Sequence, residues 1–371
     1  MPFERTRLTL ARERRRLTAL DLAKRTGRSS RTVRNYEKGD TVPADRTVKE
    51  LALALRFAPK FFYGPPVDLL SKEFADGRER ASFRSRHDLR ARDRASVLAA
   101  GVMASIVAQV VAERFHLPAP DVPELDVNEE GPDQLTPEAA AAYVRDRYNL
   151  GDRPIKNVLH VLEAHGIRVF RLTEDLTAVD AFCFRGGDAP YVLLNSSKSG
   201  ERSRFDAAHE LGHLVMHRHV EPVGREAETQ AHRFASAFLA PPRGLRKELP
   251  RTPSFPALFR LKRKWGMSVA ALVKAGHRAG VYNDWQAKRM WIEINKRGWR
   301  KAEPHPLAHE QSQIYAKVAG ILHGKGESLE SIAAEVGIQG ADVRDFVVLP
   351  EGDAPRPMRV ARQRGNLQLL V

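Results

Sequence analysis

The first sixty residues contain short stretches of helical apolar periodicity that end at sharp stops. Thr18 can cap a helix that ends before Gly27. Ser29 or Ser30 can start the next helix, which Gly39 closes, and apolar positions recur at helical spacing over residues 46–55. Two short helices joined by a glycine-containing turn predict a helix-turn-helix at the start of the chain.

Residues 95–111 lack charged side chains and resemble a membrane span in composition. The stretch is short for a bilayer, rich in alanine and interrupted by serine, glycine and glutamine, so it predicts a helix that faces a protein core. The prolines and acids of residues 117–133 exclude a regular element and indicate a linker. Such a linker either lets two halves of the chain move or wraps one of them.

From Thr136 the pattern changes to one that mixes helices and strands. Pro137 suits the first position of an Ala-rich helix, and a second helix is expected at 157–164. Three short strand-like runs then precede a helix over 202–217, namely 167–172, 181–184 and 191–195. The chain is therefore predicted to be mostly α with a small β-sheet, an α+β fold.

The region from residue 281 onward is predicted to be helical. A helix over 282–294 carries tryptophans that are expected in a core rather than in a ligand site. Residues 328–336 and 341–348 form a second helix pair, but its second helix is not rich in arginine, so packing is expected rather than DNA reading. Residues 356–364 carry several arginines that either hold phosphate or stay solvated.

Charge narrows the choice of partner. The 371 residues carry a formal net charge of +15, and residues 1–60 alone hold 16 Lys/Arg against 7 Asp/Glu, a net of +9. This excess predicts double-stranded DNA as a partner, although a genome that favours arginine codons would also raise the charge. The single Cys183 excludes an internal disulfide framework, and the chain starts without a signal peptide, so we expect a cytoplasmic protein without membrane contact.

The string His-Glu-Leu-Gly-His over residues 209–213 is the strongest chemical signal. Two histidines four residues apart project from one face of a helix, so His209 and His213 can bind one Zn²⁺ ion. Glu210 lies beside the metal rather than on it, and it can take a proton from the water that the metal activates. Apolar neighbours place this string on a buried helix, which disfavours the alternative of two solvated histidines. The pattern predicts a metallopeptidase site with Glu210 as the catalytic base.

A catalytic zinc needs a third protein ligand and an open position. Downstream candidates are numerous, and the sequence does not decide among His217, His219, Glu221, Glu226, Glu228 and His232. His217 is disfavoured because it lies one further turn along the same straight helix. Glu228 begins a second helix that can face the histidine pair, and His232 lies one turn later, either as a ligand itself or as a hydrogen-bond partner of one.

The first domain resembles the XRE/Cro helix-turn-helix family. The shared pattern is Leu-Thr-x-x-x-Leu-Ala-x-x-Thr-Gly-x-Ser, then Thr-Val-x-x-Tyr-Glu-x-Gly, within residues 6–63. The resemblance implies base contacts from Ser30, Arg31 and Asn35, with Arg31 suited to guanine and Asn35 to adenine, whereas Arg34 suits a phosphate. One departure is Ala19, where the family often has a glutamine that contacts phosphate. The alternative is a helical domain that no longer binds DNA and makes protein contacts.

Residues 137–273 resemble the ImmA/IrrE metallopeptidases. The matching strings are Arg-Phe-x-x-Ala-His-Glu-Leu-Gly-His-Leu-Val-Met-His from residue 204 and Glu-x-x-Ala-x-x-Phe-Ala-x-x-x-Leu-x-Pro from residue 228. The resemblance implies a zincin-like domain with metal ligands His209, His213 and Glu228, Glu210 as base, and Zn²⁺, with Mn²⁺ as an alternative. The family usually has asparagine at the position of His232. Some members cleave an XRE-type repressor in stress responses or mobile-element control.

These features predict four parts, an XRE-type helix-turn-helix domain at 1–66, a charged connector and linker at 67–135, a metallopeptidase domain at 136–280 and a helical region at 281–371. The predicted function is a DNA-binding, zinc-dependent endopeptidase that cleaves a transcriptional repressor or antitoxin-like protein. One alternative is a non-catalytic regulator whose metal domain senses a ligand or holds a partner, and another is an antitoxin that represses its own operon. A homodimer is compatible with each of these functions.

Overall fold

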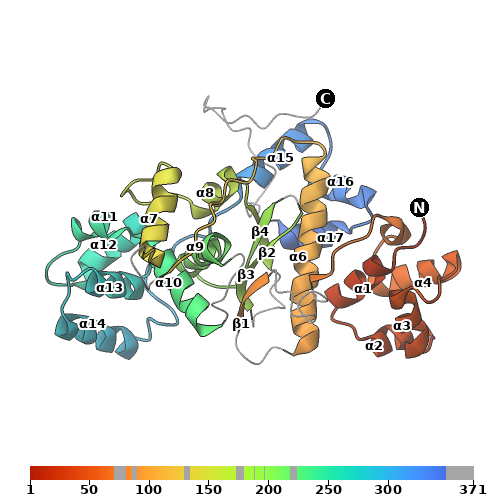
Figure 1. Cartoon of the computed structure of the whole chain (residues 1–371), viewed down its shortest axis with the longest axis horizontal. Coiled ribbons are helices and arrows are strands. Elements are labelled where there is room, and N and C mark those ends of the chain that lie inside the picture. The colour runs from red at the N-terminus through yellow and green to blue at the C-terminus, as the bar shows by residue number, and fades with distance from the viewer. Residues whose placement is uncertain are drawn as a thin grey trace.

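The computed structural model describes residues 1–70, 81–85, 90–128, 134–172, 179–187, 189–195, 197–217 and 224–347. Within these ranges a mixed β-sheet lies at the middle of an elongated molecule, with helices on both sides of it (Figure 1). The N-terminal helices occupy one end of the long axis, and the helices of residues 242–296 occupy the other end (Figure 1). The predicted fold class, mostly helical with a small sheet, is confirmed.

The N-terminal domain consists of α1 (Arg5–Arg14), α2 (Ala19–Arg25), α3 (Ser30–Lys38), α4 (Asp45–Leu55) and a 3-10 helix (Pro59–Tyr63). Thr18 and Asp21 form a capping box at the start of α2, because each side chain accepts from the other residue's backbone N–H. The Ser29 hydroxyl accepts from the Thr32 N–H, and Gly39 ends α3 at a φ of 85°. The predicted start and stop residues of the two central helices are therefore confirmed.

The sheet contains four strands within the described part of the chain, β1 (Ala81–Ser85), β2 (Arg168–Leu172), β3 (Val179–Arg185) and β4 (Pro190–Asn195). Their order is β1-β3-β4-β2, with β2 parallel to β4 and the other two pairs antiparallel. The three predicted strands are confirmed with small shifts of their ends. β1 was missed, because it lies in a stretch dense in arginine and pairs with a strand almost a hundred residues further along the chain.

Side chains alternate between two hydrophobic cores on the two faces of the sheet. Phe170, Phe182 and Leu193 belong to a core shared with the N-terminal helices and with α6 (Ala91–Ala112). Val169 and Val192 belong to a second core, that of residues 137–296, which we call the metal-motif half because they include the histidine motif. α6 has the length and hydropathy of a membrane span, but 78% of its most apolar window is buried inside the protein. The prediction that residues 95–111 form a core-facing helix is therefore confirmed.

The metal-motif half is helical around the second core. Its helices are α7 (Pro137–Arg147), α8 (Val158–Ala164), α9 (Gly200–Met216), α10 (Arg225–Leu239), α11 (Pro242–Arg246), α12 (Phe255–Trp265), α13 (Val269–Arg278) and α14 (Asp284–Lys296).

The expectation that the tryptophans of α14 lie in the core is right for Trp291 and wrong for Trp285. Trp291 packs against the core, but Trp285 is 66% exposed, because it lies on the opposite face of α14 from the buried Met290 and Ile294.

The linker wraps the metal-motif half along its described residues. The backbone N–H of Asp121 donates to the carbonyl of His165, and that of Leu125 donates to the carbonyl of Val215 at the end of α9. The Tyr148 hydroxyl donates to the Asp121 carbonyl, and Leu125 packs against the second core. Of the two behaviours open to such a linker, these contacts favour wrapping.

The C-terminal helices α15 (Gln313–Gly324), α16 (Leu329–Glu335) and α17 (Gly340–Phe346) return to the N-terminal half. Asp342, which is 3% exposed, accepts two hydrogen bonds from the Arg15 guanidinium at 2.7 and 2.8 Å. Gly337 lies against the backbone of Phe61, where a side chain would not fit. The predicted packing role of this helix pair is confirmed, and residues 356–364 lie outside the described residues.

Candidate metal centre

Helix α9 carries both histidines of the motif. It begins where the Ser199 hydroxyl accepts from the Arg202 N–H, and it runs for 17 residues across the sheet. His209 and His213 therefore lie one turn apart on the same face. Both are almost fully buried, at 0% and 5% exposure, because α9 packs between the sheet and α10.

Helix α10 brings a carboxylate, that of Glu228, to this pair. Gly224, at a φ of 83°, precedes the first turn of α10 and lies before Glu228. Gly212 allows the close approach of the two helices, because a Cβ atom there would lie only 3.0 Å from the Phe234 ring. The glycine inside the motif thus has a packing role that the sequence did not reveal.

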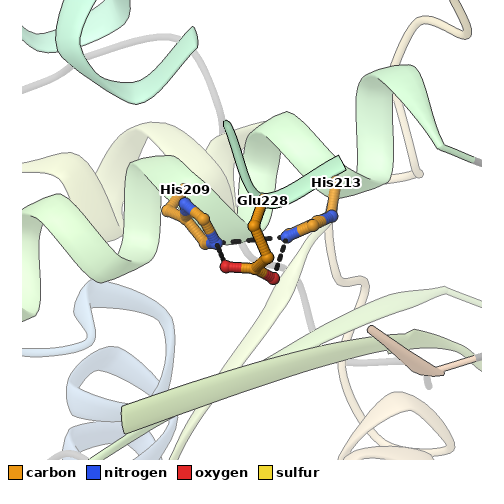
Figure 2. A group of neighbouring side chains, drawn as sticks. All are labelled: His209, His213 and Glu228. Atoms are coloured by element: carbon orange, nitrogen blue, oxygen red, sulfur yellow. Dashed lines mark hydrogen bonds and ion pairs between the residues drawn. The ribbon is translucent and has the colours of Figure 1, made fainter. Parts of the chain in front are cut away.

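The three side chains converge on one point (Figure 2). The Nε2 atoms of His209 and His213 are 3.1 Å apart, and the Glu228 carboxylate oxygens lie 3.4 Å from His209 Nε2 and 3.3 Å from His213 Nε2. Ligands at about 2.0–2.1 Å from one tetrahedral ion lie roughly 3.3 Å apart. The donor set therefore fits a single metal ion, and among the candidates that the structure describes it includes Glu228.

The environment of Glu228 suits a metal ligand. Burial raises the pKa of this carboxyl, but its interactions with the imidazoles of His209 and His213 outweigh burial and hold the pKa well below its usual range. The side chain of Glu228 is 32% exposed, whereas that of His209 is fully buried. The site thus has two enclosed nitrogen donors and one ionised carboxylate that is partly exposed to solvent.

Glu210 is the candidate base. It follows His209 on α9 and is completely buried. Its place beside the first histidine is the one that a proton acceptor needs in this kind of site. Its role as the base stays a prediction.

His217 contacts one of the three donors, an interaction that sequence reasoning missed. Its Nδ1 lies 2.9 Å from Nδ1 of His213, and its Nε2 lies 2.9 Å from the amide oxygen of Gln230 on α10. Burial lowers the pKa of His217 to about 4, so the ring is neutral at pH 7. The amide oxygen accepts the proton of Nε2, so His217 Nδ1 accepts the proton of His213 Nδ1. The Nε2 lone pair of His213 is then left for a metal.

Among the candidates that the structure describes, His232 and Glu226 are not part of the group of three converging donors. The His232 ring packs edge-on against that of His209 with centroids 4.7 Å apart, and its Nδ1 lies 2.6 Å from the Glu228 carbonyl. Glu226 is exposed on the first turn of α10. The positions of His219 and Glu221 lie outside the described residues. A supporting role for His232 stays a prediction.

The predicted DNA-contacting residues lie on α3, at the far end of the molecule from the metal-motif half (Figure 1). Arg31 and Arg34 are exposed, and Ser30 and Asn35 are half-buried. The one fully buried residue of α3 is Val33, and Lys38 is exposed together with the two arginines. This arrangement leaves the arginines accessible to a duplex, although their individual contacts stay predictions.

Two family models match the chain. A peptidase model described as the IrrE N-terminal-like domain matches residues 162–275, which include α9, α10 and all three converging donors. A model of a helix-turn-helix domain matches residues 5–60, which include α1 to α4. No curated protein matches the chain. The two matched regions thus coincide with the two sites described above.

Proposed function

We propose that this chain, which carries an IrrE N-terminal-like domain behind a helix-turn-helix domain, is a zinc-dependent endopeptidase that binds DNA and cleaves a regulatory protein. The convergence of His209, His213 and Glu228 on one point carries the proposal. Two imidazole nitrogens and a carboxylate are a donor set of catalytic zinc sites, which leave a position open for water or substrate. Manganese is the alternative metal, and a nitrogen-rich set favours zinc over it.

In the proposed reaction the three donors hold the metal ion, and Glu210 transfers the proton. A bound zinc ion would lower the pKa of a water molecule toward about 7 and polarise the carbonyl of the scissile peptide bond. Glu210 accepts the proton of that water as it attacks the carbonyl carbon. Glu210 then gives the proton to the amide nitrogen as the carbon–nitrogen bond breaks, so the leaving group departs as an amine. Burial of Glu210 excludes bulk water from this transfer.

The DNA-binding domain supports a regulator as the substrate. A peptidase tethered to DNA meets proteins bound at the same locus far more often than free peptides, because tethering raises the effective concentration. An XRE-type repressor or an antitoxin-like protein, acting in a stress response or in mobile-element control, fits this arrangement. The domain also supports the proposed cytoplasmic location, where such a substrate and the DNA occur together.

Replacement of Glu210 tests the proposal. The Glu210→Gln variant should retain one zinc per chain, because the three donors remain, but it should lose proteolysis. New protein N-termini can be labelled and sequenced in cells that express wild type or variant. We expect cleavage products in the wild-type cells that are absent in the Glu210→Gln cells.

The His209→Ala variant is the matched control, since it should lose both the metal and the cleavage products. Metal content is measured on the purified full chain by elemental analysis. If Glu210→Gln yields the same new N-termini as wild type, the proposed mechanism is wrong. If no variant changes the N-termini, the chain is a regulator without peptidase activity.

A further inference from the structure

Positive charge is concentrated in a second region that the helix-turn-helix does not include. Residues 243–301, which contain most of α11 and all of α12 to α14, hold 16 Lys/Arg against 3 Asp/Glu, a net of +13. This net exceeds the +9 of residues 1–60. Since the whole chain carries +15, the remaining residues together carry −7. A codon bias toward arginine acts on the whole chain, so it does not explain charge confined to two regions.

Nearly all of this charge faces solvent. Every lysine and arginine of residues 243–301 is exposed except Lys262, which is fully buried and pairs with Glu201 and Glu303. The three acids are already engaged, since Glu248 pairs with Lys264, Glu293 with Arg297 and Asp284 with His277. Most of the exposed positive charges therefore have no carboxylate of their own region to neutralise them. We call these exposed lysines and arginines the basic surface.

Helix α14 shows how the basic surface is arranged. Trp285, Lys288, Arg289, Ile292 and Lys296 recur at helical spacing and are all exposed. The Arg289 guanidinium lies over the Trp285 ring, with its central carbon 5.4 Å from the ring centroid. This face thus combines positive charge with an exposed aromatic ring, a combination that suits contact with a polyanion.

We propose that the basic surface binds the phosphate backbone of double-stranded DNA, as a second DNA contact beside the helix-turn-helix. Protein–DNA interfaces are polar and strongly positive, whereas the core of a protein–protein interface is depleted in charge. The basic surface is dense in charge, and in its region only Trp285 and Ile292 are large exposed apolar side chains. The helices that carry it lie at the opposite end of the long axis from α3, so the proposed second contact and the helix-turn-helix are at the two ends of the molecule (Figure 1).

Salt-dependent binding of the full chain to a short duplex of random sequence tests the proposal. The Lys288→Gln/Arg289→Gln/Lys296→Gln variant should bind about tenfold or more weakly at low salt. The slope of log affinity against log salt concentration should become shallower by about 0.9 for each phosphate that the variant no longer neutralises. The Arg31→Ala/Arg34→Ala variant, which disables the helix-turn-helix, should retain much of its random-duplex affinity until the three α14 substitutions are added.

A second triple variant, Arg153→Gln/Lys317→Gln/Lys325→Gln, is the matched control. It removes the same number of exposed positive charges from outside the basic surface and outside residues 1–60. We expect it to bind random duplex almost as wild type does. Equal weakening by both triple variants would show that net charge alone drives binding, and an unchanged α14 variant would show that the surface does not touch DNA. Either result overturns the proposal.

Anionic vesicles distinguish a membrane from DNA. Vesicles of phosphatidylcholine and phosphatidylserine are mixed with the full chain and sedimented. We expect the α14 substitutions to affect duplex binding far more than vesicle binding. Vesicle binding that depends on α14, together with duplex binding that does not, would assign the basic surface to a membrane and overturn the proposal.

Discussion

At the scale of single residues, the position of one proton decides whether His213 can bind a metal. An imidazole offers a lone pair only from the nitrogen that carries no hydrogen. A chain of two hydrogen bonds, from His213 to His217 and from His217 to Gln230, forms a relay that places this hydrogen on Nδ1 of His213. The Nε2 lone pair of His213 then points toward His209 and Glu228. His217 is therefore a positioning residue that acts through His213.

Replacement of His217 should weaken zinc binding without unfolding the protein. We expect the His217→Ala variant to bind zinc about 10–100-fold more weakly, which is the usual effect of removing the partner of a metal-binding histidine. Competition with a chromogenic chelator measures this affinity. Long-range proton–nitrogen NMR spectra of the metal-free protein report the tautomer of His213 directly, and the Nδ1–H form should be less populated in the variant.

Rescue separates positioning from simple packing. In His217→Asn the amide oxygen can accept the same proton, so this variant should recover a large part of the zinc affinity. In Gln230→Leu the side-chain volume is kept, but the proton of His217 Nε2 loses its acceptor. The zinc affinity of this variant should therefore fall. Wild-type affinity and an unchanged His213 tautomer in His217→Ala would contradict the role assigned to His217.

The sequence predicted the residues of the site that depend on local spacing. His209 and His213 follow from the period of one helix, so the motif alone places them on one face. Glu228 remained one of six candidates, because its selection depends on how α10 packs against α9. The role of His217 was missed for the same reason, since its partner Gln230 lies on the other helix.

At the scale of elements, close packing of α6 on the sheet holds the two halves together. Gly101 of α6 faces the rings of Phe182 and Phe184, and a Cβ atom there would lie 2.9 Å from a carbon of each ring. Such a distance requires the helix or the rings to shift. The glycine therefore sets the distance between α6 and β3.

The Gly101→Ala variant should be less stable than wild type. Overpacking of this kind costs about 1–3 kcal/mol, which outweighs the roughly 0.5–1 kcal/mol that alanine contributes to a helix relative to glycine. Gly320→Ala on α15 is the matched control, because its Cβ atom would meet nothing within 4 Å. Urea unfolding should give a lower midpoint for Gly101→Ala and an equal or higher one for Gly320→Ala. A raised midpoint for both would show that α6 adjusts freely.

Most elements could be predicted from local signals, because capping residues, glycine stops and apolar periods act within a few residues of the chain. β1 could not, since a five-residue strand in an arginine-rich stretch gains its pairing only from β3. The exposure of Trp285 could not either. A tryptophan at helical spacing predicts burial, but the side of α14 that meets the core is chosen by the helices around it.

At the scale of the whole molecule, a segment between α14 and α15 links the metal-motif half to the C-terminal helices. Glu310 pairs with Arg204 of α9, and its other oxygen accepts from the backbone N–H groups of Val158 and Leu159 at the start of α8. Further along, Ser312 at the start of α15 donates to the carboxylate of Glu163. The segment thus ties the helix of the metal ligands to the helices that pack on the N-terminal domain.

Glu163 should make this link sensitive to pH. Burial raises the pKa of Glu163 to about 7, despite the N–H groups of Gln313 and Ile314 that donate to its carboxylate. The folded protein therefore holds a proton that the unfolded chain releases near its ordinary pKa of about 4.5. This stabilisation is fully present below about pH 4.5 and is lost as pH rises through about 7. At about 1.36 kcal/mol per pKa unit, the loss is on the order of 3 kcal/mol.

The Glu163→Gln variant isolates this effect. A neutral amide cannot ionise, so the free energy of unfolding should fall less between about pH 5 and about pH 8 than it does in wild type. The variant should be more stable than wild type at the higher pH. Glu327→Gln, at an exposed position beyond α15, is the control and should keep the wild-type pH dependence. Urea unfolding at both pH values measures the difference. Parallel curves for wild type and Glu163→Gln would show that Glu163 does not titrate on unfolding, and that the link between the two halves is insensitive to pH.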